Sequence, residues 1–372
     1  MTKPAATIYP PHHSMTLLSR LLLTPRDSSG ASATMRAQLA ADLHSLSKAE
    51  FDDLLTMADL NHVVVRGMKL MIELISPLKD EERIGWATAA LEVEQARISL
   101  AVGFLHKICT ALEESRFEVA VIKSLDHWPD LGSDLDLYSN AKSEDIARVM
   151  KKHFSAEMDA RSWGDRLARK WNFLIPGLPE SVEIHMGRLG QTGEQVTIAS
   201  GLIKRGRLVS VEGRTFRVTH TSDRILISTL QRMYRHFYFR LCDIVDSAAL
   251  IESGQVDFED LRRVATAAEI WEGTATYLMI VSDYVKQYRG TAVELFQFVK
   301  SAARFGGGDV FYAKGFLRVP IMPQSAKLYG SQLAGLLRKR ELNNGVRLSL
   351  LPWLATAAVV GQKLTGSDKG IW

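Results

Sequence analysis

Hydrophobic residues recur every three or four positions over most of this chain, and the pattern changes to strand-like alternation only between about residues 116 and 220. Recurrence every three or four positions is typical of an amphipathic helix, and alternation is typical of a half-buried strand. Helical spacing covers residues 35–58, 80–112, 222–248, 258–267, 270–288 and 293–303, and it resumes at about residue 325. The sequence therefore predicts an α+β fold, in which a small mixed sheet of four or five strands is flanked by N-terminal helices and a C-terminal helical bundle.

The alternating region begins with residues 119–138, which read VAVIKSLDHWPDLGSDLDLY. A short apolar run precedes a polar loop that contains proline and glycine, and an alternating segment follows, so the pattern predicts two strands joined by a turn. Side chains at positions i and i+2 of a strand share a face. Asp134 and Asp136 therefore project to one side of the second strand, and Leu135 and Leu137 project to the other.

The alternating region continues with a basic segment at residues 161–170, a strand-like run at 171–175 and a PGLP turn. The segment SVEIHMG that follows alternates again, which predicts another strand. Glu183 and His185 share one face of this strand, and its apolar residues share the other. Glu183 is therefore a third carboxylate on a strand face.

A β-hairpin over residues 208–219 closes the alternating region, and the helix that starts at Ser222 follows it. The polar side of this predicted helix carries Arg232, His236, Arg240 and Asp243. Because Arg240 and Asp243 are three residues apart, an internal ion pair is one interpretation of this polar side. Contact with a ligand is the other.

These patterns divide the chain into four segments. A flexible leader is expected over residues 1–34, because a composition with four prolines and the run SSGAS cannot support much packed structure. An N-terminal helical segment over 35–115, an α+β core over 116–220 and a C-terminal helical domain over 221–372 are expected after it.

The composition is that of an ordinary globular protein: 372 residues, a formal net charge of +4 and a pI of about 8.9. This mildly basic balance does not by itself indicate nucleic acid, and it is compatible with an anionic small-molecule ligand. Cys109 and Cys242 are the only cysteines. They exclude a disulfide scaffold and a cysteine-based zinc cluster, and they favour a reducing, cytoplasmic compartment.

No apolar run reaches about 18 residues, so a transmembrane helix is not expected. The nearest candidate, residues 348–361, predicts a buried core helix. A basic cluster at residues 338–340 lies just upstream, so peripheral contact of residues 338–361 with a membrane surface is the alternative.

The carboxylates of the alternating region favour a metal site. Like charges on one strand face repel, and a cation bound by Asp134 and Asp136 would remove that cost. With Glu183 as a third ligand, the set suits Mg²⁺ or Mn²⁺. His185 is either a donor to these ligands or a surface residue of its strand. An EF-hand that starts at Asp134 is excluded because its sixth position is Ser139 instead of glycine, and neither common glycine-rich phosphate loop is present.

Two further polar groups are candidates for the same site. Ser133 precedes the carboxylates and either orients the site or ends the loop. One or two basic residues of the segment 161–170, Lys170 among them, are expected to bind phosphate, and a solvated charged face is the alternative.

Ser124 ends a predicted strand, nine residues separate it from Asp134, and a third carboxylate lies on a later strand. This arrangement resembles the DNA polymerase β-like nucleotidyltransferase superfamily. Within it, the chain is similar to the uncharacterised nucleotidyltransferase family of bacteria over roughly residues 80–255. The matching positions are IKS (122–124), DLDL (134–137), VEIH (182–185) and His236 with the later DIVDSAALI (243–251).

The resemblance implies a metal-dependent nucleotidyltransferase that moves a nucleoside monophosphate from a nucleoside triphosphate to an acceptor hydroxyl. The acceptor is a small molecule, a peptide or protein, or an RNA end. The active site is expected between the sheet and the C-terminal helices. Asp134, Asp136 and Glu183 would bind Mg²⁺ or Mn²⁺ and act in catalysis, with Glu183 helping to deprotonate the acceptor. The expected nucleotide contacts are Lys123, Ser124, Ser133, Lys170, His236 and Arg240.

The family has glycine where this chain has Ser124, and that glycine lets backbone N–H groups approach the phosphates. A serine hydroxyl can donate to phosphate instead. A second hypothesis is therefore a catalytically weak or inactive protein that keeps the nucleotidyltransferase fold for binding or as a scaffold. A third is a membrane-peripheral partner protein that uses residues 338–361.

Overall fold

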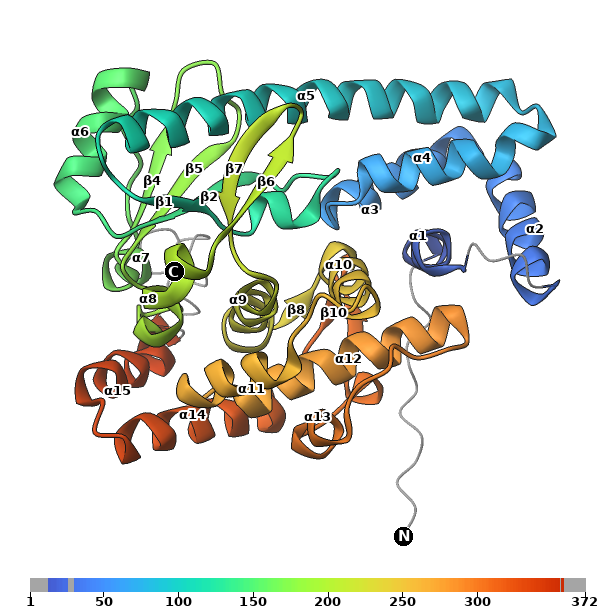
Figure 1. Cartoon of the computed structure of the whole chain (residues 1–372). Coiled ribbons are helices and arrows are strands. Elements are labelled where there is room, and N and C mark those ends of the chain that lie inside the picture. The colour runs from blue at the N-terminus through green and yellow to red at the C-terminus, as the bar shows by residue number, and fades with distance from the viewer. Residues whose placement is uncertain (1–12, 26–29, 355, 358–372) are drawn as a thin grey trace, which may run out of the picture.

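The computed structural model describes residues 13–25, 30–354 and 356–357, and its fold is α+β, as the sequence predicts (Figure 1). Its helices are α1 (His13–Leu23), α2 (Gly30–His44), α3 (Lys48–Leu60), α4 (Val64–Ile75), α5 (Glu81–Glu114), α6 (Ser143–Phe154), α7 (Trp163–Ala168), α8 (Val196–Arg205), α9 (Thr221–Tyr234), α10 (Leu241–Glu252), α11 (Phe258–Ala267), α12 (Trp271–Arg289), α13 (Gln297–Ala302), α14 (Ala326–Arg338) and α15 (Leu342–Ser349). Its strands are β1 (Val119–Val121), β2 (Asp134–Ser139), β3 (Glu157–Met158), β4 (Lys170–Leu174), β5 (Ser181–Met186), β6 (Arg207–Val211), β7 (Arg214–Val218), β8 (Tyr238–Phe239), β9 (Phe311–Ala313) and β10 (Phe316–Arg318).

A mixed seven-stranded sheet in the order β3-β4-β5-β2-β1-β7-β6 forms the centre of the fold. Its middle strand, β2, is antiparallel to β1 and parallel to β5. The sheet is wider than the four or five strands expected. The predicted hairpin β6–β7 joins β1 through a parallel bridge between Val121 and Val218, and the two-residue strand β3 adds an edge beside β4.

The two faces of this sheet are covered by different helices. Leu135 and Leu137 of β2 are fully buried in a core that includes residues of α5 and α6, as the alternation predicts. Asp134 and Asp136 project to the opposite face, toward α9, which lies below the sheet in Figure 1. The candidate site therefore lies between the sheet and the C-terminal helices.

The N-terminal and C-terminal helices share one hydrophobic core. Leu17 and Leu18 of α1 are buried in it, and the hydroxyl groups of Ser19 and Tyr284 hydrogen-bond at 2.7 Å to join α1 to α12. The expectation of a flexible leader is therefore wrong for residues 13–23, because their apolar side chains pack on helices distant in sequence. It is also wrong for residues 30–34, which form the first turn of α2, and residues 1–12 and 26–29 of that leader lie outside the described residues.

The helix expected over residues 222–248 is interrupted between α9 and α10. Phe237 has a φ of 54°, which a right-handed helix cannot contain. Strand β8 follows at once and pairs with β10 in a three-stranded sheet with β9. His236 and Arg240 are therefore loop residues beside this small sheet, and not part of one helical stripe.

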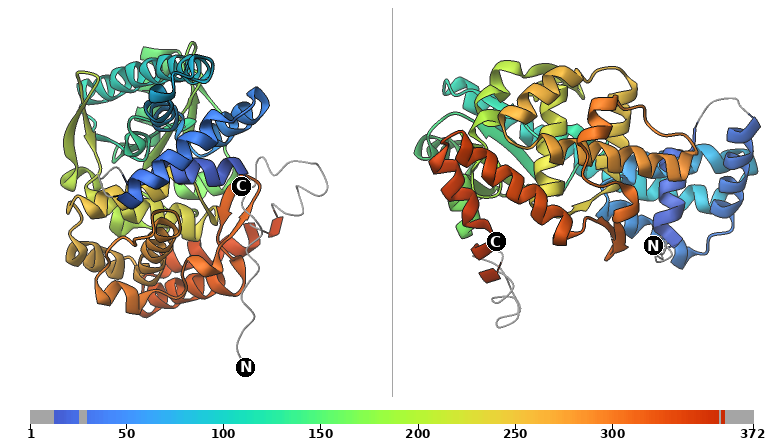
Figure 2. Two further views of the ribbon diagram at one scale, coloured as in Figure 1. Left: turned by 90° about the vertical axis from the view of Figure 1, so that its right-hand side faces the viewer. Right: turned by 90° about the horizontal axis from the view of Figure 1, so that it is seen from below.

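Helices α14 and α15 lie at the opposite end of the molecule from the N-terminal helices (Figure 2). In the apolar stretch 348–361, Leu348 and Leu351 are buried in a small cluster with Leu336, apart from the two larger cores, whereas Trp353 is exposed, so only part of the expected core helix is buried. Residues 355 and 358–361 lie outside the described residues, and membrane contact by residues 338–361 stays a prediction. Every helix among the described residues is too short or too polar to cross a bilayer.

Asp80 caps the 34-residue helix α5, as the sequence predicts. Its carboxylate accepts a hydrogen bond from the backbone N–H of Arg83 at 3.2 Å and lies 2.6 Å from Nδ1 of His44. Although burial acts in the other direction, these partners hold the pKa of Asp80 below its ordinary value.

Replacing Asp80 with alanine is expected to lower the free energy of unfolding by about 1–2 kcal/mol at pH 7, because the cap is lost. A lowered folded-state pKa means that the charge contributes stability above the unfolded pKa of 3.8 and loses it as the pH falls through the folded value. Urea denaturation should therefore show the larger difference at pH 7 and a smaller one near pH 3. Glu81→Ala, in the same turn, is the control, and an equal loss in both variants would contradict the cap assignment.

Candidate active site

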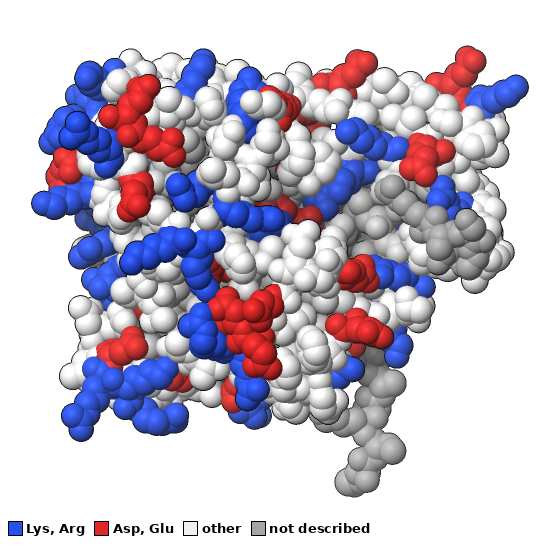
Figure 3. Space-filling view, in the orientation of Figure 1, with Lys and Arg blue, Asp and Glu red and all other residues white. Residues whose placement is uncertain are grey.

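Basic and acidic side chains are interspersed over the surface shown in Figure 3. Seven further charged side chains line a polar pocket of about 160 Å³ between the sheet and α9. Its charged lining consists of four basic residues, Lys123, Arg232, Arg235 and Arg240, and three acidic residues, Asp134, Asp136 and Glu183. Five of the six expected nucleotide contacts line this pocket: Lys123, Ser124, Ser133, His236 and Arg240.

The parallel pairing of β2 with β5 brings the carboxylates together. Asp136 is directly opposite Glu183 in the register, and Asp134 is opposite Ser181. Asp136 and Glu183 are each 8% exposed, whereas Asp134 is exposed at the start of its strand. Two carboxylates thus lie side by side in the pocket, and the third lies at its rim.

Two lysines neutralise this pair from different sides. The ammonium group of Lys123 forms an ion pair with Oδ1 of Asp136 and lies 3.4 Å from Oε1 of Glu183. The ammonium group of Lys170 lies 2.8 Å from Oε2 of Glu183 and 2.9 Å from Oδ1 of Asp165. Lys170 does not line the pocket and its charge is used by two carboxylates, so we assign it to holding Glu183 in place and not to binding phosphate.

His185, from the same strand face as Glu183, completes the cluster. Its Nε2 lies 2.7 Å from Oε1 of Glu183 and 4.0 Å from Oδ1 of Asp136. Burial lowers the pKa of His185 to about 4 even though Glu183 opposes the shift, so the ring is neutral near pH 7. A neutral ring that donates from Nε2 to Glu183 leaves Nδ1 as an acceptor, and that buried atom has no hydrogen-bond partner among the described residues. Of the two interpretations of His185, the structure supports a donor to the carboxylates.

The two buried carboxylates have opposite pKa shifts. Burial raises the pKa of Asp136 to about 8; the Lys123 charge opposes this shift, and the Glu183 charge adds to it. Burial also acts to raise the pKa of Glu183, but Lys123, His185 and Lys170 together hold it well below its ordinary value. The pair therefore holds one firmly ionised carboxylate and one that is costly to ionise even with Lys123 beside it.

Ser124 does not present its hydroxyl to the pocket as a phosphate donor. Its Oγ accepts a hydrogen bond from the backbone N–H of Asp136 at 2.7 Å and lies 3.2 Å from the carbonyl oxygen of Asp134, to which it donates. The hydroxyl therefore ties the turn after β1 to β2. The phosphate contact expected from this side chain is unsupported, because both of its hydrogen-bonding functions are used within the fold.

The pocket wall opposite the carboxylates comes from α9 and the segment after it. Arg235 and Arg240 line the pocket, and neither guanidinium group forms an ion pair with a carboxylate of the described chain. Arg232 also lines it, but its Nε lies 2.7 Å from Oδ2 of Asp243. The expected Arg240–Asp243 ion pair is thus replaced by an Arg232–Asp243 pair, while the backbone N–H of Arg240 donates to Asp243 at 2.8 Å.

Arg235 is a pocket residue that the sequence pattern did not single out, because an unbroken helix was expected there, with Arg232 on its polar side. The segment RMYRHFYFR (232–240) does carry a usable signal. Three consecutive aromatic residues, 237–239, favour a strand over a helix. Burial, with the charges of Arg235 and Arg232, also lowers the pKa of His236 well below its ordinary value, so this histidine is neutral in the pocket.

His127 at the pocket wall belongs to a buried polar network. Its Nδ1 lies 2.6 Å from Asp246, whose other oxygen lies 2.7 Å from Arg66, and its Nε2 lies 3.7 Å from the sulfur of Cys242. A cysteine, a histidine and an aspartate are thus in line. Burial raises the pKa of the Cys242 thiol, so the sulfur is protonated and poorly nucleophilic. We interpret the network as a structural link between α4, α10 and the turn after β1.

The cluster on β2 and β5 fits a divalent cation. Ligand atoms of Asp136, Glu183 and His185 all lie within 4.8 Å of one another. Two carboxylates suit Mg²⁺, and one added imidazole also suits Mn²⁺. Asp134 lies outside this group of three but lines the same pocket. The expected metal ligands Asp134, Asp136 and Glu183 are therefore in one pocket, with His185 as a further candidate.

No model of a known protein family matches this chain, and no curated protein matches it either. The resemblance to nucleotidyltransferases therefore stays a prediction from the sequence motifs. The geometry of the pocket carries the functional argument.

Proposed function

We propose that this protein is a metal-dependent nucleotidyltransferase that transfers a nucleoside monophosphate from a nucleoside triphosphate to an acceptor hydroxyl. One observation carries the proposal: Asp136 and Glu183 are side by side in one pocket with Arg235 and Arg240, two arginines that form no ion pair with a carboxylate of the described residues. Carboxylates suit a divalent cation, and arginines suit phosphate oxygens. A metal-bound triphosphate has this combination of charges.

In this proposal Asp136 and Glu183 hold Mg²⁺ or Mn²⁺, with Asp134 or His185 as a further ligand. When bound, the cation supplies charge neutralisation for the triphosphate and stabilises the leaving pyrophosphate. Arg235 and Arg240 bind and orient the phosphates from the opposite wall. The acceptor oxygen attacks the α-phosphorus, the bond from the α-phosphorus to the bridging oxygen breaks, and pyrophosphate leaves.

Asp134 is a better base than Glu183 for the proton of the acceptor hydroxyl. The low pKa of Glu183 makes it a good cation ligand and a poor base. Asp134 lies at the pocket rim, where partial burial of its carboxylate together with the Glu183 charge raises its pKa. We therefore assign proton acceptance to Asp134, which an entering acceptor can reach.

A second candidate function, a nucleotide-binding or scaffold protein without turnover, is supported by the turn after β1. The Ser124 hydroxyl is used within the fold, and the Lys123 ammonium group lies between the carboxylates instead of among the arginines. Both features reduce the phosphate contacts available from this turn.

Binding of labelled ATP, GTP, CTP and UTP, with and without Mg²⁺, tests the proposal, and pyrophosphate release with a fractionated cell extract as the acceptor source tests turnover. We expect at least one nucleotide to bind in a Mg²⁺-dependent manner and to release pyrophosphate. Mg²⁺-dependent binding without release would favour the second candidate. No Mg²⁺-dependent binding of any of the four would contradict both.

A further inference from the structure

Lys123 occupies the position between the two buried carboxylates. Its ammonium group pairs with Oδ1 of Asp136 and with Oε1 of Glu183, and these are oxygens of the same residues that form the candidate metal cluster. Two carboxylates that share one lysine have, in effect, an internal monovalent cation. A divalent ion that binds both carboxylates must take the place of this ammonium group.

The backbone at Lys123 directs the side chain to this position. Lys123 has φ 62° and ψ −58°, and the N–H of Ser124 donates to the carbonyl oxygen of Ile122 at 2.6 Å. These values describe a γ-turn of the rare, strained kind, at a residue that is not glycine. The Ser124 hydroxyl bonds to β2 keep the turn in register with Asp136. The fold thus holds a lysine in a costly conformation that places its charge on the carboxylates.

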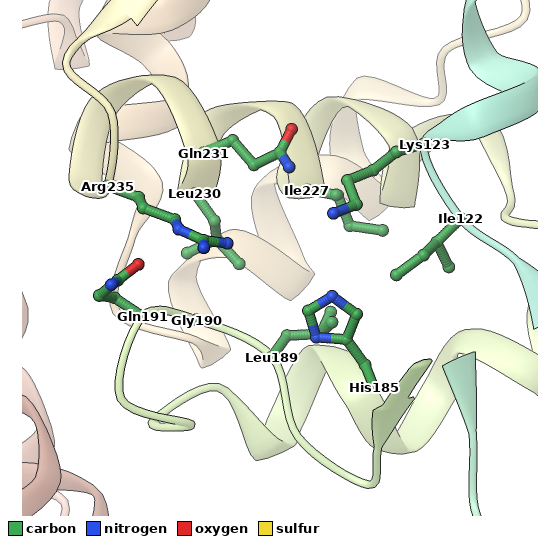
Figure 4. Close-up of a pocket in the computed structure, with 10 residues that line it drawn as sticks. All are labelled: Ile122, Lys123, His185, Leu189, Gly190, Gln191, Ile227, Leu230, Gln231 and Arg235. Atoms are coloured by element: carbon green, nitrogen blue, oxygen red, sulfur yellow. The ribbon is translucent and has the colours of Figure 1, made fainter. Parts of the chain in front are cut away.

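The Lys123 side chain also has room to leave. It lines the polar pocket, and it lines a second, smaller pocket of about 30 Å³ with His185, Gln231 and Arg235 (Figure 4). In Figure 4 the side chains of Lys123 and Arg235 point into the space between α9 and the loop that carries Gly190. After a small rotation of the Lys123 side chain, its ammonium group would therefore still lie in a pocket, and the positively charged wall of this pocket suits anions.

We infer that Lys123 is a built-in substitute for the divalent cation: it occupies the carboxylate pair in the metal-free protein, is displaced when metal binds, and then joins Arg235 and Arg240 on the triphosphate. This inference rests on the proposed function. Because metal and lysine compete while metal and nucleotide cooperate, metal alone binds weakly and nucleotide strengthens its binding, with reciprocal coupling. Lys123 therefore keeps free metal from binding tightly before the nucleotide binds.

The direct test measures Mn²⁺ binding without nucleotide, by the electron paramagnetic resonance signal of free Mn²⁺. Lys123→Met removes the internal cation and keeps a side chain of similar length. It is expected to bind Mn²⁺ about tenfold or more tightly than the wild type, because one charge at the site is removed. Lys123→Arg, which keeps the charge, should resemble the wild type.

Arg235→Met is the matched control. It removes one positive charge from the same pocket, but Arg235 forms no ion pair with a described carboxylate. Its Mn²⁺ affinity is expected to stay within about threefold of the wild type, since its charge is farther from the carboxylates than the charge of Lys123. An increase in Arg235→Met equal to that in Lys123→Met would show a general charge effect and overturn the inference.

Labelling of the wild-type protein supplies a second readout that does not depend on a variant that folds. Reductive methylation followed by mass spectrometry is expected to label Lys123 slowly in the metal-free protein and severalfold faster with Mg²⁺ alone. Lys170, held by Asp165 and Glu183 outside the pocket, should stay protected in both states. Unchanged labelling of Lys123 at saturating metal would overturn displacement.

The outcomes separate this inference from the proposed function. If the wild type and Lys123→Met bind Mn²⁺ equally tightly, the inference is wrong and the metal site stands. If neither binds Mn²⁺ at millimolar concentration, the metal site and the inference both fail.

Discussion

Replacing Asp136 with asparagine is expected to abolish Mg²⁺-dependent nucleotide binding and pyrophosphate release, with a loss of about 100-fold or more. Asp136 contributes a carboxylate at the centre of the pocket, opposite Glu183 in the register of β2 and β5. Asparagine keeps the size but cannot carry the charge that a divalent cation requires. The loss should appear in equilibrium binding of labelled nucleotide and in the initial rate of pyrophosphate release.

The fold is expected to survive this change. Burial makes the ionised form of Asp136 costly, as its pKa of about 8 indicates, and asparagine removes that cost. Lys123 keeps Glu183 as its partner. Thermal unfolding of the variant should therefore match that of the wild type within a few degrees. Asp145→Asn, in the first turn of α6 and outside the pocket, is the control and should bind normally. An Asp136→Asn variant that binds nucleotide with unchanged Mg²⁺ dependence would refute the metal assignment.

Replacing Arg232 with methionine is expected to lower the free energy of unfolding by about 3–5 kcal/mol. Arg232 is 3% exposed and its partner Asp243 is 2% exposed, and their ion pair is 2.7 Å long. Removing the guanidinium group would leave a buried carboxylate that lacks its counter-charge. Urea denaturation, followed by circular dichroism, measures the loss.

The double variant Arg232→Met/Asp243→Asn separates the charge from the packing. Asparagine at position 243 can still accept the hydrogen bond from the backbone N–H of Arg240. The double variant should therefore recover much of the stability lost in the single variant, because no uncompensated charge remains. A double variant as unstable as Arg232→Met would show that the guanidinium group acts through packing. A single variant Arg232→Met with the free energy of unfolding of the wild type would show that the ion pair is unimportant.

Local pattern was sufficient for the elements that surround the site. Period-2 alternation assigned the face of Asp134 and Asp136 on β2, and the same rule placed Glu183 and His185 together on β5. These assignments succeed because the side-chain direction in a strand depends only on the position within that strand. The cap at Asp80 was readable for a similar reason, since a capping side chain bonds its own helix.

The break after α9 shows where local pattern failed. Apolar spacing continued from Ser222 to Ala248, so one helix was expected. Strand β8 forms instead by pairing with β10, about 80 residues later in the chain. The prediction for residues 13–23 failed for the same reason, because the apolar face of α1 packs on α12. Partners this distant in sequence leave no periodic signal beside the segment that they stabilise.

Acidic strand faces within an α+β fold could be recognised from the amino-acid sequence, because both properties follow from composition and from a two-residue repeat. The tertiary structure was needed to show that Asp136 lies beside Glu183, since that depends on the register of two strands separated in sequence by α6, β3, α7 and β4. It also decided the roles of the lysines. Lys123 and Lys170 are 47 positions apart in the sequence, yet both form ion pairs with Glu183. A buried carboxylate needs cations nearby, and the tertiary fold places these two lysines beside it.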